Sequence, residues 1–267
     1  MSHPERHLRA IHEESKDESD MNSTKNHIHV IRLGHTEYKW CWDLQQRLLE
    51  LRAPGTISDT LLLTEHSPVY TIGKTGDENH LLANDAELRE RGVAVFNCDR
   101  GGDITYHGPG QLVGYPILDL QGYYLDLHRY LRDIEEVIIR TLGRFGVTGT
   151  RMADYTGVWV GGNKICAIGI KTSRWITMHG FAFNVATDLS YFDRIIPCGI
   201  FEKGVTSLQE ILGTMVNQDH VAGIVTEEFG EVFGVDVRET LLPDLLSPNS
   251  IHIHKDPSYI QQTISSL

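Results

Sequence analysis

The chain has few cysteines, no long apolar run and no excess of positive charge. Its four cysteines are far apart, without the paired spacing of a zinc site or a disulfide framework: Cys41, Cys98, Cys166 and Cys198. Such spacing is typical of free thiols in a reducing compartment, so we expect a cytoplasmic protein. No stretch approaches the roughly 20 apolar residues of a membrane span, and no apolar run follows the first charges as in a secretory signal. We therefore expect no membrane partner.

The formal net charge of −12 is unevenly distributed along the chain. Residues 209–267 hold two basic residues against nine acidic ones, a net charge of −7. An acidic chain argues against a nucleic-acid partner, whose phosphates need a basic surface. An acidic protein partner would need a local basic patch, and the candidates for it are Arg100, Lys164, Lys171, Arg174, Arg194 and Lys203.

The length and the hydrophobic content predict one large domain with tails. Hydrophobic residues make up 40% of 267 residues, enough for a sizeable core. Residues 1–26 are polar, charged and aperiodic, which predicts a disordered N-terminal tail. We place the folded domain at 27–240 and a weakly patterned C-terminal extension at 241–267.

Hydrophobic periodicity predicts an α+β (mixed α/β) fold rather than strict strand–helix alternation. Strands are expected at 27–33, 60–64, 93–96, 112–118, 176–185 and 235–237, and a hairpin at 158–160 and 165–168. Helices are expected after caps at Thr36, Asn84 and Ser207, and at 127–145 and 217–233. Residues 67–74 and 100–111 are expected to be loops, and Lys171–Arg174 a turn.

The segment from Arg100 to Gln111 holds four glycines beside several polar side chains. Glycines let a backbone approach a ligand closely or turn its N–H groups inward. Arginine, threonine, tyrosine and histidine in the same segment can surround a reacting centre. We interpret the segment as part of a ligand site, against the alternative of a glycine-rich connector.

Cys198 is the cysteine best placed to be a nucleophile. It lies between Pro197 and Gly199 in an expected loop, where side chains are presented rather than packed. Cys41 and Cys166 occupy expected helix and strand positions and are predicted to be packed, as is Cys98. A nucleophilic cysteine must be a thiolate, so a nearby cation is needed. Lys164, at the start of the second hairpin strand, is our candidate, against the alternative of a solvated turn lysine.

The histidines offer one acid–base candidate and two weaker metal candidates. His107 lies within the glycine-rich segment and is a possible general acid or base. The pairs His27/His29 and His252/His254 lie near the chain ends without nearby cysteines, so exposed positions are favoured over zinc ligation. No metal site is predicted.

Four motifs together closely resemble the lipoyl(octanoyl) transferases of lipoate biosynthesis. The resemblance covers about residues 28–213 and rests on Arg100-Gly101-Gly102 with Thr105–Gln111, Gly162–Gly169, His179–Asn184 and Arg194–Gly199. It implies a domain similar to the catalytic domains of lipoate and biotin ligases, with a mixed sheet flanked by helices. The leucines common in the family are replaced by Ile168 and Phe181.

The resemblance also implies a reaction and its residues. An octanoyl group passes from octanoyl-acyl carrier protein to a lysine of lipoyl domains, in 2-oxoacid dehydrogenases and the glycine cleavage H protein. Cys198 would carry the acyl group as a thioester and Lys164 would be its partner, with no cofactor. The implied substrate-contacting residues are Arg100, Gly101, Gly102, Asp103, Ile104, Thr105, Tyr106, His107, Ala167, Ile168, Gly169, Gly180, Phe181 and Ala182.

Three alternatives remain open on the sequence. An ATP-dependent lipoate or biotin ligase would activate a free acid and would not need Cys198. A non-catalytic protein that binds an acyl group or a lipoyl domain would not need a nucleophile. A cysteine hydrolase would pass the acyl group to water.

Overall fold

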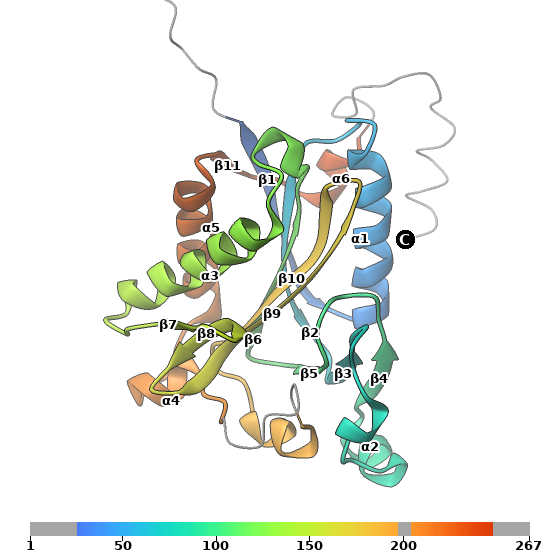
Figure 1. Cartoon of the computed structure of the whole chain (residues 1–267), viewed down its shortest axis with the longest axis vertical. Helices are drawn as coiled ribbons and strands as arrows, with labels where there is room; N and C mark the ends of the chain where they lie inside the picture. Colours follow the sequence, from blue (N-terminus) through green and yellow to red (C-terminus); the bar gives the residue numbers. More distant parts are fainter. Residues whose placement is uncertain (1–25, 197–203, 248–267) are drawn as a thin grey trace, which may run out of the picture.

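The computed structural model describes residues 26–196 and 204–247. Its centre is a mixed eight-stranded sheet in the order β11-β1-β2-β6-β10-β9-β8-β7 (Figure 1). The strands are β1 (His27–Thr36), β2 (Thr60–His66), β6 (Gln111–Ile117), β7 (Thr150–Met152), β8 (Tyr155–Val160), β9 (Asn163–Ser173), β10 (Ile176–Asn184) and β11 (Asp236–Glu239). Only β1 pairs in parallel, with β2 and β11; all other neighbours within this described sheet are antiparallel. The predicted mixed fold is confirmed.

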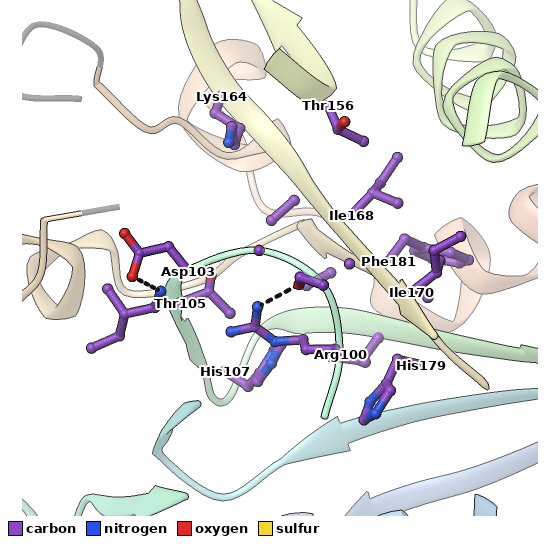
Figure 2. Close-up of a pocket in the computed structure, with 18 of the residues that line it drawn as sticks. Arg100, Asp103, Thr105, His107, Thr156, Lys164, Ile168, Ile170, His179 and Phe181 are labelled. Carbon is purple, nitrogen blue, oxygen red and sulfur yellow. Dashed lines mark hydrogen bonds between the residues drawn. The ribbon is translucent and has the colours of Figure 1, made fainter. Parts of the chain in front are cut away.

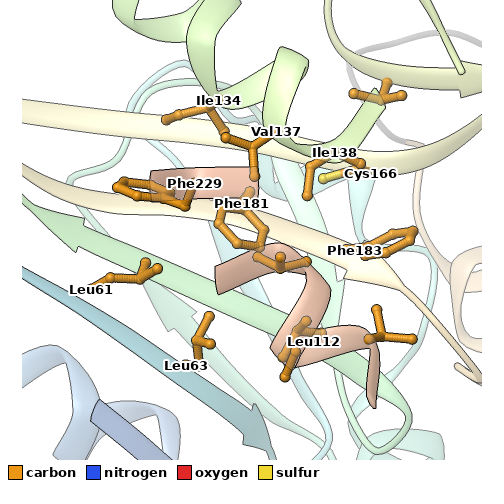
Figure 3. Close-up of a cluster of buried hydrophobic side chains, with 14 of the residues drawn as sticks. Leu61, Leu63, Leu112, Ile134, Val137, Ile138, Cys166, Phe181, Phe183 and Phe229 are labelled. Atoms are coloured by element: carbon orange, nitrogen blue, oxygen red, sulfur yellow. The ribbon is translucent and has the colours of Figure 1, made fainter. Parts of the chain in front are cut away.

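Helices cover both faces of this sheet (Figure 1). On one face, α3 (Leu127–Arg144) and α5 (Gln218–Phe233) bury a core with Phe181 and Phe183 of β10 (Figure 3). On the other face, α1 (Tyr38–Arg52) buries a second core with Met178 and Ala182 of the same strand. The side-chain alternation of a strand explains why neighbouring residues of β10 enter opposite cores.

A smaller three-stranded sheet lies beside the α1 face, in the order β4-β3-β5. Its strands and the short elements around it are β3 (Val69–Ile72), β4 (Ala94–Asn97), β5 (Ile104–His107), η1 (Glu78–His80), α2 (Asp85–Arg91) and η3 (Leu189–Arg194). The remaining elements are η2 (Leu120–Gly122), α4 (Leu208–Leu212) and α6 (Leu242–Leu245). Leu245 and Leu246 pack into the α1 core, while the predicted domain boundary after residue 240 stays a prediction.

Among the described residues, one edge of β9 has no strand partner along the second half of the strand. β8 pairs with β9 only as far as Cys166, whereas β10 pairs with it as far as Ser173. The outer edge of β9 after Cys166 is instead approached by the glycine-rich segment, where the Gly101 N–H donates to the Ile170 carbonyl over 2.9 Å. This free edge is where the site described below is built.

Several predicted elements need correction. Thr36 ends β1 instead of capping a helix, and α1 begins at Tyr38 after Glu37, which has no side-chain capping bond. Tertiary pairing makes strands of Val69–Ile72 and Ile104–His107, both expected to be loops. β9 continues to Ser173, so the turn falls at Arg174 and Trp175, and β11 begins at Asp236.

The other expected elements are present. Asn84 caps α2 with a full capping box, and Gly161 and Gly162 form the hairpin turn with positive φ angles of 57° and 86°. Cys41 and Cys166 are buried as predicted, and the partly exposed Cys98 donates to the Ile72 carbonyl. Residues 1–25 and 248–267, with the predicted tail and the pair His252/His254, lie outside the described residues.

Candidate active site

A cavity of about 480 Å³ lies between β9, β10 and the glycine-rich segment (Figure 2). Its floor on the α1 face is a row of small residues in register across three strands: Val113, Ala182 and Ala167. Ile168, Ile170 and Phe181, which belong to the opposite face, also line it. The cavity therefore passes around the free edge of β9 and has one polar and one apolar part.

The glycine-rich segment forms one wall of the cavity. Two glycines outside it, Gly169 in β9 and Gly73 after β3, allow this wall to lie close to both. A Cβ atom at Gly169 would fall 2.8 Å from the Gly101 carbonyl oxygen. A Cβ at Gly73 would fall 2.2 Å from the Gly102 carbonyl oxygen. Backbone bonds from Gly73 to Asp103 (3.2 Å) and from Lys74 to Arg100 (3.0 Å) fix the same wall from its other side. The segment is thus a packed wall rather than a loose connector.

Arg100 is a buried cation within this wall. Its guanidinium donates to the Thr71 carbonyl over 2.6 Å and to the Thr71 hydroxyl over 2.9 Å. A third bond, of 3.0 Å, reaches the carbonyl of Gly101 (Figure 2). These partners are neutral acceptors, so the positive charge of Arg100 is available to a polar group in the cavity.

Lys164 enters the cavity because β9 carries a bulge. Val158 pairs with Cys166 and Trp159 pairs with Lys164, so Ile165 is an extra residue in β9. Ile165 and Cys166 both enter the α3–α5 core, which turns Lys164 to the other face. Its ammonium lies 4.8 Å from the centre of the Trp159 ring, a cation–π contact that orients the side chain.

The backbone of Lys164 also holds the chain that follows residue 203. The Lys164 N–H donates to the Gly204 carbonyl over 2.9 Å, and the Thr206 N–H donates to the Lys164 carbonyl over 3.0 Å. The Asn184 amide donates to the Thr206 carbonyl over 3.1 Å and accepts from the Gln111 amide over 2.9 Å. A row of hydrogen bonds thus links the glycine-rich segment to Lys164.

His107 begins this row and is held in its neutral form. Its Nδ1 donates to the Gln111 side-chain oxygen over 2.9 Å, because the amide nitrogen of Gln111 is engaged elsewhere. Burial is the main cause that lowers the pKa of His107 well below its ordinary value, with the charges of His66 and Arg100 as further causes. Figure 2 places Lys164 well away from His107, across the glycine-rich segment.

The cavity gathers nearly all the residues predicted from the sequence. The lining includes Lys164, Arg100, Gly101, Gly102, Asp103, Ile104, Thr105, His107, Ala167, Ile168, Gly169, Gly180, Phe181 and Ala182. Tyr106 does not line it: its ring points away and stacks on Tyr191, with centroids 4.5 Å apart. Alternation along β5 puts Tyr106 on the opposite side from Thr105 and His107. Cys198 lies outside the described residues.

Other lining residues were not predicted. Tyr38 comes from α1, Leu131 from α3, and Thr156 from β8. Gln111, His179 and Asn184 are the exceptions that carried a signal, since each belongs to a quoted motif. No local pattern could have found Tyr38, Leu131 and Thr156, because the packing of α1 and α3 and the pairing of β8 bring them to the cavity.

Two further predictions concern charge and metals. In the expected basic patch, Lys171 is paired with Asp99 and Arg194 with Glu87, so both charges are partly neutralised. Among residues 26–196 and 204–247, no cluster of histidine, cysteine or acidic side chains could hold a metal ion. Within the same ranges, no helix is long and apolar enough to cross a membrane.

Comparisons with known proteins identify the family of the chain. Residues 37–230 match the family described as the lipoyl protein ligase A/B catalytic domain. An octanoyltransferase of Rubrobacter xylanophilus is 55% identical over 210 residues, covering 78% of this chain and 94% of that protein. An octanoyltransferase of Flavobacterium psychrophilum is 46% identical over 234 residues, covering 81% of this chain and all of that protein (100%).

The fold has a solved counterpart at low sequence identity. The bi-partite lipoate protein ligase of Thermoplasma acidophilum superposes with a TM-score of 0.65 at 15% identity, covering 87% of this chain and 99% of that one. The fold and the family match together define an acyl-handling catalytic domain of the lipoyl protein ligase class. Within that class the chain belongs to the octanoyltransferases, which confirms the resemblance inferred from the four motifs.

Proposed function

We propose that this acyltransferase moves an octanoyl group from octanoyl-acyl carrier protein to a lysine of lipoyl domains through a thioester on Cys198. The acceptor domains would be those of 2-oxoacid dehydrogenases and the glycine cleavage H protein. Octanoyltransferase relatives that are matched over 94% and 100% of their own length support the reaction class. The residues of the reaction are proposed from the site itself.

The observation that carries the mechanism is the attachment of both flanks of the Cys198 segment to the cavity. Before it, the Ile196 N–H donates to the His80 carbonyl, and the His80 ring contacts Asp103 over 2.6 Å. After it, Gly204 accepts from the Lys164 backbone over 2.9 Å. Cys198 follows Ile196 by two residues, so the chain that carries the thiol leaves and returns at the cavity wall.

Lys164 favours the thiolate of Cys198 through its positive charge. A cysteine has an ordinary pKa of about 8.5, and a neighbouring cation stabilises the ionised form. The thiolate attacks the thioester carbonyl of the donor, the tetrahedral oxyanion collapses, and the carrier thiolate leaves with a proton from the Lys164 ammonium, which becomes a neutral amine. The exchange of one thioester for another needs no ATP and no metal ion.

The second half-reaction needs a proton acceptor. The amine of the incoming lysine attacks the Cys198 thioester, loses a proton, and expels the cysteine sulfur as an amide forms. We assign the acceptor role to Lys164, neutral after the first half-reaction, rather than to His107; the proton returns it to the ammonium form beside the released thiolate. His107 is buried, already donates to Gln111, and lies across the cavity from Lys164.

The apolar part of the cavity is the proposed place of the acyl chain. Ile168, Ile170 and Phe181 line it and pack against the α3–α5 core. An eight-carbon chain there would replace water against apolar side chains, worth about 0.8 kcal/mol for each buried methylene. The neighbouring polar wall at Arg100 and Gly101 would face the thioester end.

The test is intact mass and peptide mapping after incubation with octanoyl-acyl carrier protein, without any lipoyl domain. We expect a hydroxylamine-labile octanoyl adduct on Cys198, lost in Cys198→Ala. No adduct on Cys198, together with octanoylation of a lipoyl domain that required free octanoate and ATP, would instead indicate a ligase. Transfer by Cys198→Ala at the wild-type rate would overturn the covalent mechanism.

A further inference from the structure

His179 has a backbone conformation that is unusual for its place in a strand. It lies inside β10 with a φ of +56°, in the left-handed region that disfavours residues with a Cβ atom. The other described non-glycine residues with positive φ, Arg174 and Trp175, belong to the hairpin turn. A left-handed residue costs of the order of 1–3 kcal/mol and persists only where its surroundings impose it.

The consequence of this conformation is that the consecutive side chains of Met178 and His179 lie on the same face of the sheet, the one that α1 covers. Phe181 and Phe183 enter the α3–α5 core, and regular alternation would send His179 to that side. Instead the His179 ring lies 6.4 Å from the Trp42 ring of α1, whose core also contains Met178. The change of backbone direction therefore delivers an imidazole to the α1 face of the sheet.

Two polar contacts hold His179 there, and a third holds its partner Asp99. The Gln45 side-chain oxygen accepts from the His179 backbone N–H over 2.8 Å. The ring Nε2 lies 2.7 Å from Asp99 Oδ1, and Lys171 Nζ lies 2.5 Å from Asp99 Oδ2. The side chain is only 2% exposed. Burial lowers the pKa of His179 to about 4, so at neutral pH the ring is neutral and its Nε2–H donates to the carboxylate.

Asp99 immediately precedes the cavity wall at Arg100–Asp103. The contact with His179 and the bond from Gly101 to Ile170 are therefore two adjacent attachments of this wall to the β9–β10 hairpin. They act together with the backbone bonds from Gly73 and Lys74, which fix the other side of the wall. The wall and the His179 ring line the same cavity.

We propose that Asp99 and His179 are positioning residues that hold the Arg100–Asp103 wall against the hairpin and so set the affinity for the acyl donor, not the rate of acyl transfer. We call the Asp99–His179 contact the clamp. The identity of the donor rests on the proposed function, whereas the clamp rests on the contacts described above. Loss of either partner would loosen the wall and leave Lys164 and Cys198 intact.

The test compares His179→Gly, Asp99→Ala and the double variant. Glycine accepts the left-handed φ without strain, so His179→Gly removes the imidazole and keeps the backbone. Each change should raise the KM for octanoyl-acyl carrier protein about tenfold, the typical worth of a hydrogen bond to a charged group, with kcat within about twofold. The double variant should also show about tenfold and match Asp99→Ala, because His179 acts on the wall through Asp99, which also pairs with Lys171.

Matched measurements separate the clamp from a general loss of structure. Glu228→Gln on α5 removes an ion pair with Arg144 far from the cavity. It should change neither KM nor kcat. Hydrogen exchange at the Gly101 amide should become faster in Asp99→Ala and His179→Gly and stay unchanged in Glu228→Gln. Unchanged exchange and unchanged KM in the two variants would overturn the clamp.

A binding experiment distinguishes failure of the clamp from failure of the function. In a Cys198→Ala background, calorimetry with octanoyl-acyl carrier protein should give a dissociation constant that Asp99→Ala raises about tenfold. If the Cys198→Ala protein does not bind octanoyl-acyl carrier protein, the proposed donor is wrong. If it binds this donor and the added Asp99→Ala change leaves the dissociation constant unchanged, the clamp alone is wrong.

Discussion

The two sides of the cavity carry chemically capable side chains in contrasting environments. On one side, Lys164 is partly exposed, aimed by a bulge, and contacts the backbone at Gly204. On the other, His107 and His179 are buried, neutral and hydrogen-bonded to fixed partners. The comparison teaches that residue type does not decide a role. A histidine whose lone pairs and protons are committed to structure is a poor proton carrier, whereas Lys164 is held through its backbone and presents its ammonium at the cavity against the Trp159 ring.

The largest effect is expected from removing the cation on the Lys164 side. Lys164→Ala should lower kcat about 10³-fold, within the usual range for loss of an acid–base group. The pH midpoint for alkylation of Cys198 by iodoacetamide should rise toward about 8.5, the ordinary cysteine pKa. Lys39→Ala, which removes an exposed lysine paired with Asp43, is the control. An unchanged alkylation profile would remove the activating role from Lys164.

The wall between the two sides should be nearly as sensitive. In Gly169→Ala the new methyl group meets the Gly101 carbonyl at 2.8 Å, so the wall must move. A displacement of about 1 Å can cost about 10²-fold, so kcat/KM should fall about 10- to 100-fold. The matched control is Gly143→Ala in α3, where nothing lies within 4 Å of the new Cβ. It should keep full activity and gain up to about 1 kcal/mol of unfolding free energy. Equal kinetics for the two variants would contradict the close packing.

Lys164 and the glycine-rich wall show how much of the site can be predicted from the sequence. The glycine-rich segment and the Lys164 motif are dense local signals, and the structure brings them to one cavity. The bulge at Ile165 and the left-handed φ of His179 were invisible, because both depend on partners far away in the chain. β5 was missed for a related reason: its alternation is only four residues long and becomes a strand through pairing with β3.

The row of hydrogen bonds between the two sides predicts a smaller effect. Asn184→Ala removes the bond that holds the Thr206 carbonyl and one of the two acceptors of the Gln111 amide, whose bond to the Tyr106 carbonyl remains. We expect kcat to fall about tenfold, with a stability loss of about 1–3 kcal/mol from the unpaired buried group. Asn97→Ala, at an exposed position in β4, should leave kcat unchanged. Steady-state kinetics together with denaturant unfolding would separate the two consequences, and a variant with lower stability but normal kcat would exclude Asn184 from positioning Lys164.

The effect on catalysis should be smallest at His66, which lies beside His107 but does not line the cavity. Its Nδ1 donates to the Thr36 carbonyl and its Nε2 accepts from Tyr115, so the folded protein holds it neutral. Burial lowers the pKa of His66 to about 4, against 6.5 for an ordinary histidine.

The sign of the pH effect follows from this depressed pKa. Above pH 6.5 neither state is protonated at His66, and the stabilising contacts are complete. As the pH falls from 6.5 toward 4, the unfolded chain takes up a proton that the folded protein refuses, so the free energy of unfolding falls. Near pH 5 the contribution to the slope is about 1 kcal/mol per pH unit for one such histidine. His66→Gln should flatten the slope by that amount while leaving kcat at pH 7.5 within about threefold, an effect of under about 0.7 kcal/mol. Urea unfolding from pH 4.5 to 7.5, with His128→Gln as the control that removes an exposed histidine, measures it. A slope equal to that of the wild type would mean that His66 is not held neutral, and the contrast between the two sides of the cavity would then rest on His107 and His179 alone.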